Sequence, residues 1–295
     1  MEVLAQTVAM GFLMGGLYAL LAIAIVLIFK ATKVFNLGTG GLLMAGAYIF
    51  YFFFAQLRLP IWLCLSFLLT ISIVLGLAIE RLTMRPFIGH PDPLAPVMVT
   101  LALWVLLEGL IVTVWGGGIK SYPSGLPTGV LSMGKAVVPE ILFIGFVITV
   151  VLVISLAAFF QYHPLGLAMK VTAESHQIAQ SLGIDVKVVF AISWAIATGL
   201  SMLTGTILAV HMGLSEVLPN IALKALSVVL VGGLNSLIGA FLGGFIVGII
   251  EALFTSYLTP YIGRGVGELA PYLILLVILL VRPHGLFGIK EVERI

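Results

Sequence analysis

Residues 4–29, LAQTVAMGFLMGGLYALLAIAIVLIF, form an apolar run without a charged residue. A helix needs about 20 apolar residues to cross the roughly 30 Å hydrocarbon core of a bilayer, so this run is long enough to span one. The N-terminal sequence lacks the basic region and the short apolar region of a cleaved signal peptide. We therefore expect the run to be retained as the first of several transmembrane helices.

The rest of the chain repeats this pattern. Of its 295 residues, 61% are hydrophobic and 9% are charged, whereas about a quarter are charged in an ordinary soluble domain. Helices are expected because lipid cannot satisfy free backbone groups and because the runs do not alternate as barrel strands do. The sequence predicts an all-α, polytopic transmembrane bundle of about eight or nine spans in one domain, residues 1–295. The apolar runs are 4–29, 37–57, 61–79, 94–115, 141–160, 188–210, 221–238, 239–258 and 269–281.

The seventh run, residues 221–238, is short and contains Lys224 and the sequence VGGLNSLIG. These features predict a broken or re-entrant element as an alternative to a simple crossing. Glycines four residues apart also recur, a spacing that lets helix backbones approach closely in lipid. Helix packing is one interpretation of these glycines, and sliding beside a permeation path is another. The pairs are Gly11 and Gly15, Gly239 and Gly243, and Gly244 and Gly248.

The basic residues predict the orientation, because cytoplasmic loops of membrane proteins are enriched in Lys and Arg. If the N-terminus is outside and all nine runs cross, nine basic residues lie inside and five outside. The C-terminus and residues 161–187 are then cytoplasmic, and the Gly-, Pro- and Ser-rich loop 116–140 is external and consists of turns. The five outer residues are Arg58, Lys120, Lys135, Lys224 and Arg264.

Several classes of function lack support. The single cysteine, Cys64, allows neither an intrachain disulfide nor a cysteine metal cluster, and no histidine spacing typical of a metal site occurs. Residues 116–121, GGGIKS, differ from a phosphate-binding loop because Ile119 separates the glycine from the lysine. We expect no cofactor, no metal, no nucleic-acid partner and no ATP site in this chain.

A few polar residues inside the apolar runs are candidates for a solute pathway. Glu108 and Glu251 lie well inside their runs, where a charge is costly, so each contacts protein, water or a substrate. In residues 34–48, VFNLGTGGLLMAGAY, the candidates are Asn36, Thr39 and Gly41, because small polar groups there could let a polar solute pass. The alternative for this stretch is an ordinary helix start with Asn36 as its N-cap.

Residues 163–187, HPLGLAMKVTAESHQIAQSLGIDVK, predict a short amphipathic helix. Leu167, Val171, Ile178 and Leu182 share a face at helical spacing, and Gly183 is a C-cap candidate. Such a helix at the cytoplasmic surface fits docking to another protein and binding in the lipid headgroup layer equally well.

The order and spacing of four motifs closely resemble the LivH-type inner-membrane permeases of branched-chain amino acid ABC importers. These are residues 34–48, residues 164–209, the stretch VVLVGGLNSLIGAFLGGFIVGIIEAL and the closing VRPHGLFG. The resemblance implies a bacterial or archaeal cytoplasmic-membrane importer with a LivM-like second permease, two cytoplasmic ATPases that bind ATP and Mg, and an external substrate-binding protein. It also implies that the segment from Gly166 to Gly183 contains the helix that couples the permease to an ATPase. The coupling candidates are Gly166, Lys170, Ala173, Glu174, Ile178, Ala179, Leu182 and Gly183.

One departure affects the pathway residues. Members of the family often have N-F-A-H-G-E where this chain has NLGTGG, so Thr39 and Gly41 replace a histidine and a glutamate. The family also includes importers of urea, short amides and aromatic acids, and these substrates stay open beside branched-chain amino acids. Two other classes are alternatives: an ion-coupled secondary carrier, with Glu108 or Glu251 in the ion site, and a membrane-embedded enzyme.

Overall fold

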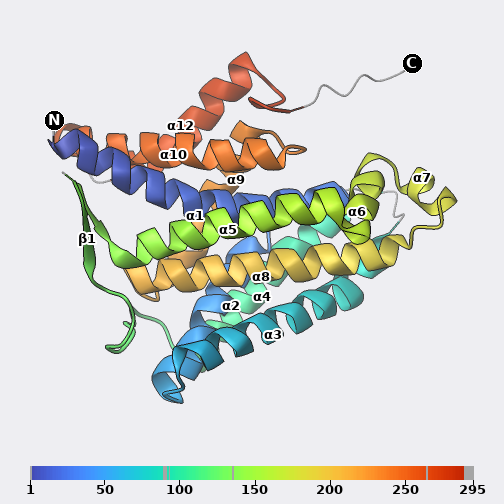
Figure 1. The fold of residues 1–295 in the computed structure, drawn as a ribbon, viewed down its shortest axis with the longest axis horizontal. Coiled ribbons are helices and arrows are strands. Elements are labelled where there is room, and N and C mark those ends of the chain that lie inside the picture. Colours follow the sequence, from blue (N-terminus) through green and yellow to red (C-terminus); the bar gives the residue numbers. More distant parts are fainter. Residues whose placement is uncertain (1, 89–91, 93, 135, 264, 289–295) are drawn as a thin grey trace. The chain divides into compact units, whose positions relative to one another are not determined.

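A computed structural model describes residues 2–88, 92, 94–134, 136–263 and 265–288. Most of these residues are helical, and the described part contains seven helices long and apolar enough to cross a membrane (Figure 1). Two shorter apolar helical stretches cover Leu218–Gly232 and Val266–Val281. The all-α, polytopic fold class predicted from the sequence is therefore confirmed.

The long helices correspond to the apolar runs. The second and third continue into short π-helical turns, η1 (Phe52–Gln56) and η2 (Glu80–Met84). The other helical elements are α1 (Glu2–Thr32), α2 (Thr39–Tyr51), α3 (Ile61–Ile79), η3 (Arg85–Phe87), α4 (Leu94–Trp115), α5 (Glu140–Tyr162), α6 (Pro164–Glu174), α7 (His176–Ser181), α8 (Val186–Met212), η4 (Leu218–Asn220), α9 (Ile221–Gly232), α10 (Leu237–Tyr257), α11 (Thr259–Ile262) and α12 (Val266–Val281).

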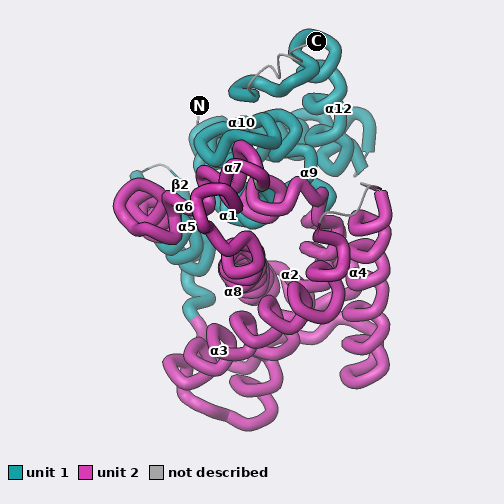
Figure 2. The backbone as a smooth tube through the Cα atoms, turned by 90° about the vertical axis from the view of Figure 1, so that its right-hand side faces the viewer, with its two compact units in different colours: residues 1–26, 127–149, 223–295 teal, residues 27–126, 150–222 magenta. Residues whose placement is uncertain are grey.

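The chain divides into two compact units, coloured separately in Figure 2. Unit 1 contains residues 1–26, 127–149 and 223–295, and unit 2 contains residues 27–126 and 150–222. Helices α1, α5 and α9 each contribute residues to both units.

Unit 2 is organised around α8, which packs against α2 and α3. The approach of α2 and α8 is so close that a Cβ atom at Gly205 would collide with the Leu43 carbonyl, and one at Gly46 would collide with Met202. Small residues allow this approach in lipid, where association depends on van der Waals packing rather than on hydrophobic burial from water.

Unit 1 uses two of the predicted glycine pairs. A Cβ atom at Gly11 would lie 2.7 Å from the Gly248 carbonyl oxygen, and one at Gly15 would lie 2.6 Å from that of Gly244. The glycines at 11 and 15 of α1 therefore face those at 244 and 248 of α10, so the packing interpretation is confirmed for these pairs.

The loop 116–140 contains an element that was not predicted. Strands β1 (Val130–Met133) and β2 (Ala136–Pro139) form an antiparallel pair in which Val130 is opposite Pro139. The amide of Gln6 extends this pair, since Val137 N donates to Gln6 Oε1 at 2.6 Å and Gln6 Nε2 donates to the Val137 carbonyl. The segment 116–140 thus contains a short strand pair besides the expected turns, and this pair was not predicted because strands this short have no clear alternation in sequence.

Candidate functional site

The first part of the candidate site is the irregular segment that joins α1 to α2. Helix α1 ends with Lys33 in a left-handed conformation, with φ of 58°, and the chain is then non-helical up to Gly38. Asn36 is 1% exposed, and its Oδ1 accepts a hydrogen bond from Gly38 N at 2.9 Å. Gly38 occupies the N-cap position of α2. The N-cap interpretation of Asn36 is therefore wrong, because its side chain closes the turn before the helix instead.

Thr100 of α4 fixes this segment from the side. Its hydroxyl, which is fully buried, accepts a hydrogen bond from Leu37 N at 3.0 Å and donates to the Val97 carbonyl at 2.8 Å. Thr39, which is 1% exposed, donates from its hydroxyl to the Asn36 carbonyl at 3.3 Å. The backbone groups freed by the break in the helix are thus partly satisfied by side chains, as buried irregular backbone requires.

The start of α2 lies beside the middle of α4. A Cβ atom at Gly40 would lie 2.9 Å from the Trp104 ring, and one at Gly41 would lie 3.0 Å from Trp104 Cα. Trp104 is ten residues after Leu94, the first residue of α4, which corresponds to about 15 Å along the helix axis. This is about half of the roughly 30 Å hydrocarbon core. If α4 crosses the bilayer, α2 therefore begins about halfway through it.

A second irregular segment follows the end of α8 and leads toward the start of α2. Gly213, with φ of 85°, ends that helix, and Leu214 and Lys120 pair through two backbone hydrogen bonds of 2.8 and 2.9 Å. In the same loop as Lys120, the Tyr122 hydroxyl donates to the Ala47 carbonyl at 2.8 Å. Burial raises the pKa of Tyr122 well above its ordinary value, so the phenol stays a neutral donor.

The chain then turns inward to η4 and α9. Leu218 is 1% exposed, and the Pro219 carbonyl oxygen lies 2.9 Å from the position of a Cβ atom on Gly40. Helix α9 has 12 residues, or about 18 Å of axis, which is too short to cross a bilayer. The prediction of a broken seventh element is therefore confirmed, and its helical part begins next to the start of α2. We call residues 33–41 and 218–221 the helix-break junction.

Four of the five predicted pathway residues lie at or near this junction. Asn36, Thr39 and Gly41 are part of it, and Glu108 accepts a 2.9 Å hydrogen bond from Trp104 Nε1, one turn away on α4. Thr100 was missed. Thr100 is the one polar residue among residues 94–103, and this could have identified it as a candidate. The feature is not specific, because a threonine in a helix often bonds only to its own backbone.

Glu251, the fifth residue, lies in unit 1 on α10. Its Oε1 forms an ion pair of 2.6 Å with Lys224 Nζ of α9, and both side chains are mostly buried, at 14% and 19% exposure. Lys224 pairs with Glu251 from within helix α9, so it is not a loop residue and does not belong in the count of basic residues for orientation. If the N-terminus is outside and the seventh run crosses as its loop and helix together, the remaining basic residues divide as nine inside and four outside.

The junction offers groups suited to a carboxylate. Asn36 Nδ2 is buried and has no hydrogen-bond partner among the described residues. The first amide groups of a helix lack partners within that helix, and its N-terminus carries a partial positive charge. A free amide donor beside the start of α2 is therefore an arrangement that can receive a negatively charged group.

The predicted coupling helix is two helices. Ser175 is extended, with φ of −156° and ψ of 122°, and separates α6 from α7. Its hydroxyl oxygen accepts a 3.3 Å hydrogen bond from Ile178 N and so caps α7. The prediction of one continuous amphipathic helix is wrong, because this cap favours a new helix start at a position where periodicity alone predicted continuation.

The predicted coupling residues divide between two faces. Gly166 and Ala179 are buried, and Ala179 packs with Val186 and Phe190 at the start of α8. Ala173 is half-buried. Gly183 has φ of 77°, which confirms the predicted left-handed helix end. The exposed candidates are Lys170, Glu174, Ile178, Leu182 and Gly183.

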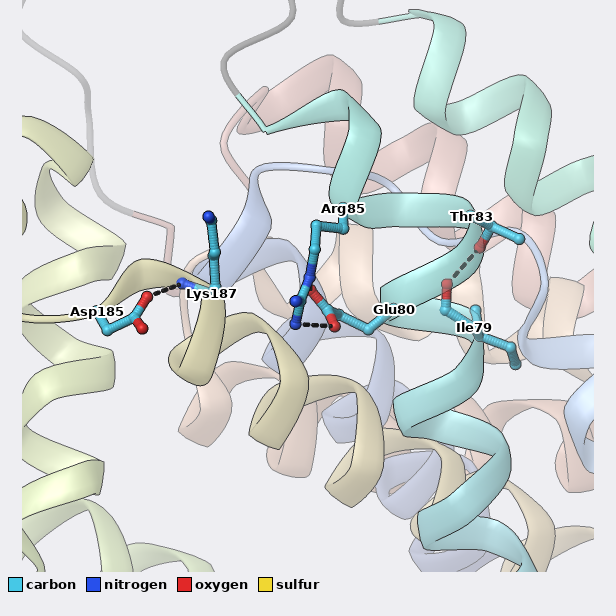
Figure 3. A network of polar contacts seen from close by, with 6 residues as sticks. All are labelled: Ile79, Glu80, Thr83, Arg85, Asp185 and Lys187. Atoms are coloured by element: carbon cyan, nitrogen blue, oxygen red, sulfur yellow. Dashed lines mark hydrogen bonds and ion pairs between the residues drawn. The ribbon is translucent and has the colours of Figure 1, made fainter.

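An ion pair lies at the same end of unit 2 (Figure 3). Glu80 is 1% exposed and receives two hydrogen bonds from Arg85, of 3.1 and 2.9 Å, which join the beginning of η2 to η3. Asp185 caps α8 by accepting from Lys187 N at 2.9 Å, and its charge acts on Arg85. The end of α3 and the start of α8 thus have complementary charges next to the coupling segment, residues 163–187.

Comparisons with known proteins agree with this architecture. The family described as "Branched-chain amino acid transport system / permease component" matches residues 7–282. The permease protein BraD of the high-affinity branched-chain amino acid transport system of Pseudomonas aeruginosa is 26% identical, covering 98% of this chain and 97% of that protein. The LivH permease of Salmonella typhimurium is 27% identical, with 97% and 96% covered.

A more distant similarity concerns the fold alone. The structure "PsaBC from Streptococcus pneumoniae in complex with Fab" has a TM-score of 0.52 and 12% sequence identity, with 94% of this chain and 92% of that chain covered. Because the family match extends over most of the chain, this multi-pass membrane protein belongs to the permease components of branched-chain amino acid transport systems.

Proposed function

We propose that the chain is the permease subunit of an ABC importer and moves branched-chain or related amino acids inward by alternating access. A second permease, two cytoplasmic ATPases and an external substrate-binding protein complete the importer. The relatives BraD and LivH, both permease proteins of high-affinity branched-chain amino acid transport systems, support the substrate class. The helix-break junction supports a transport role, and it is the observation on which the proposal chiefly rests.

Helices that start within the membrane are suited to polar solutes. A polar solute in hydrocarbon loses its hydrogen bonds with water, so a pathway must supply replacement donors and acceptors at that depth. In secondary transporters, half-helix N-termini near the bilayer midplane face anionic groups of substrates. Here α2 begins next to the middle of α4 and next to η4, which leads into α9, and Asn36 has a free donor there. An amino acid carboxylate fits this arrangement.

The coupling segment supports the link to an ATPase. Leu167, Ile178 and Leu182 are apolar but 47%, 57% and 67% exposed, so they are available to a partner protein. Ala179 anchors α7 to α8. A displacement of α7 by the ATPase would therefore be transmitted to α8, which packs against α2 in the same unit.

The distribution of basic residues supports the orientation. With Lys224 removed from the outer count, nine basic residues face inward and four outward, given an external N-terminus and a seventh run that crosses as a loop followed by the short helix α9. This orientation puts the coupling segment on the side where ATP is available.

An ion-coupled carrier is the less favoured alternative. Lys224 already neutralises Glu251, and the Glu108 carboxylate accepts from Trp104. A coupling cation bound at Glu251 would bring an unpaired charge to a neutral pair, which is costly at membrane depth.

Reconstitution tests the proposal. The chain, its second permease and the ATPases are placed in liposomes with ATP inside, and the receptor and radiolabelled leucine are added outside. We expect uptake that requires ATP and the receptor. Leucine uptake by this chain alone without ATP would exclude the proposal, and an ATP-driven importer that accepts urea or an amide but no amino acid would refute its substrate class.

A further inference from the structure

Unit 1 contains a mainly apolar cavity, with several polar side chains in its lining, that the helix-break junction does not include. It lies between α1 and α10 and has a volume of about 320 Å³, within the range of small-molecule sites. Four hydroxyl groups, an amide and a carboxylate line it, which is unusual for an interface between membrane helices. These groups belong to Gln6, Thr7, Tyr18, Glu251, Thr255 and Ser256.

The Glu251 carboxylate has free capacity on the oxygen that Lys224 does not bind. Lys224 Nζ lies 2.6 Å from Oε1. Oε2 is buried and accepts no direct hydrogen bond in the described part of the chain, although the Tyr18 hydroxyl of α1 lies close to the carboxylate. A buried carboxylate oxygen without a donor is costly, so it indicates a position that a donor from a bound molecule would fill.

Among the remaining lining groups the Ser256 hydroxyl has free capacity, whereas the Gln6 amide already bonds to Val137 and the Thr255 hydroxyl already donates to the Glu251 carbonyl. The Thr7 hydroxyl donates to Ser256 Oγ at 3.0 Å, and the Ser256 hydroxyl keeps its own proton to donate. Tyr18, which is 3% exposed, lines the cavity from the same helix as Thr7. The cavity is thus suited to a molecule with both kinds of hydrogen-bonding group.

The ion pair limits the charge of that molecule. Because Lys224 balances Glu251, a lone cation or anion would add a net charge to the site, which is costly at membrane depth. A zwitterion adds none. Its ammonium group can bond to the Glu251 carboxylate, and its carboxylate can receive the proton of the Ser256 hydroxyl, which also lines the cavity.

We infer that this cavity binds the zwitterionic head of the transported amino acid, with Glu251 as the group that receives its ammonium. This inference rests on the proposed function and adds a substrate contact outside the helix-break junction. Glu251 and Lys224 then help to select a free amino acid against amines, acids and amides of the same size.

A cysteine in the cavity reports binding directly. The variant Ser256→Cys introduces an exposed thiol, and the natural Cys64 is fully buried. In proteoliposomes, leucine is expected to slow modification of this thiol by a methanethiosulfonate reagent. The analogues 3-methylbutylamine, which lacks the carboxylate, and 4-methylpentanoate, which lacks the ammonium, are expected to protect much less. Equal protection by all three would overturn the inference.

Two further variants separate recognition from folding. Glu251→Gln in this background should raise the leucine concentration needed for protection about tenfold or more, because a charge-assisted hydrogen bond is lost. Glu268→Gln is the control, since Glu268 is exposed in the same unit. The exchange Lys224→Glu with Glu251→Lys keeps an ion pair but reverses its polarity. We expect it to assemble, yet to lose leucine protection and uptake, and restored uptake would show a merely structural pair.

The outcomes distinguish this inference from the proposed function. If the parent importer takes up no amino acid, the proposed function fails first. If the parent imports leucine and the exchanged pair does so equally well, only the inference fails. If thiol modification follows the phosphatidylethanolamine content of the vesicles rather than leucine, a lipid headgroup occupies the cavity and the inference is overturned.

Discussion

Replacing Thr100 with valine tests whether one hydrogen bond holds the helix-break junction. Valine has nearly the shape of threonine, so Thr100→Val leaves no large cavity. It removes the acceptor for Leu37 N, now at 3.0 Å, and the donor to the Val97 carbonyl. The Val97 carbonyl can keep its bond within α4, whereas the Leu37 amide lies in the non-helical segment and has no helical partner to replace Thr100.

The expected cost follows from that amide. Leaving a buried donor unsatisfied costs about 1–3 kcal/mol, and a value near 2 kcal/mol changes an equilibrium about 30-fold. The ratio of the irregular conformation of residues 33–38 to other conformations of this segment would fall by about that factor. We therefore expect a lower unfolding temperature of the purified permease and a clear loss of uptake at unchanged expression.

Thr113→Val is the matched control. Thr113 is also on α4, but it is exposed and its hydroxyl donates only to the Gly109 carbonyl of the same helix, at 2.7 Å. Unfolding temperature and initial leucine uptake are measured for both variants and the parent. If Thr100→Val unfolds and transports like Thr113→Val, the bond to Leu37 does not hold the junction, and the reasoning is refuted.

Gly40→Ala is expected to destabilise the permease and reduce uptake, because the added methyl would lie 2.9 Å from the Pro219 carbonyl oxygen and from the Trp104 ring. Gly109→Ala is the control, since Gly109 has open space around it, and it should match the parent in the same thermal unfolding and uptake assays. Ala179→Pro removes the amide that donates to the Ser175 carbonyl at 3.0 Å and should cost about 3 kcal/mol locally. The variant should insert normally but lose copurification with the ATPase and stimulation by loaded receptor, and normal coupling would exclude α7 as the docking element. In sealed cells, an impermeant maleimide should label Ser124→Cys but not Ser181→Cys, and the reverse result would invert the orientation.

The sequence by itself determined the membrane class and most of the spans. Continuous apolar runs are local features, and crossing a bilayer depends chiefly on the length and polarity of one segment. The same holds for the break in the seventh run, where Lys224 and VGGLNSLIG interrupt the apolar pattern. Gly183 was also predictable as a helix end, because a left-handed residue is a local requirement.

Local patterns were insufficient where two signals competed within a few residues. In the coupling segment, helical periodicity continues through Ser175, but this serine caps a new helix and the chain turns there. Ala179 packs against Val186 and Phe190, and of the predicted apolar face Val171 joins this cluster whereas Leu167, Ile178 and Leu182 are exposed. Which side of a short helix is buried depends on the neighbour that it meets.

Only the tertiary structure decided which polar groups meet. Thr100 is 63 residues from Leu37, and Lys224 is 27 residues from Glu251. Neither pair follows from a sequence period, because each depends on how two helices are placed side by side. A lone threonine or a buried carboxylate has several satisfactory partners in principle, and packing selects one of them. The sequence therefore identified Asn36, Thr39 and Glu251 as unusual, whereas the fold determined the partners that give each one its chemistry.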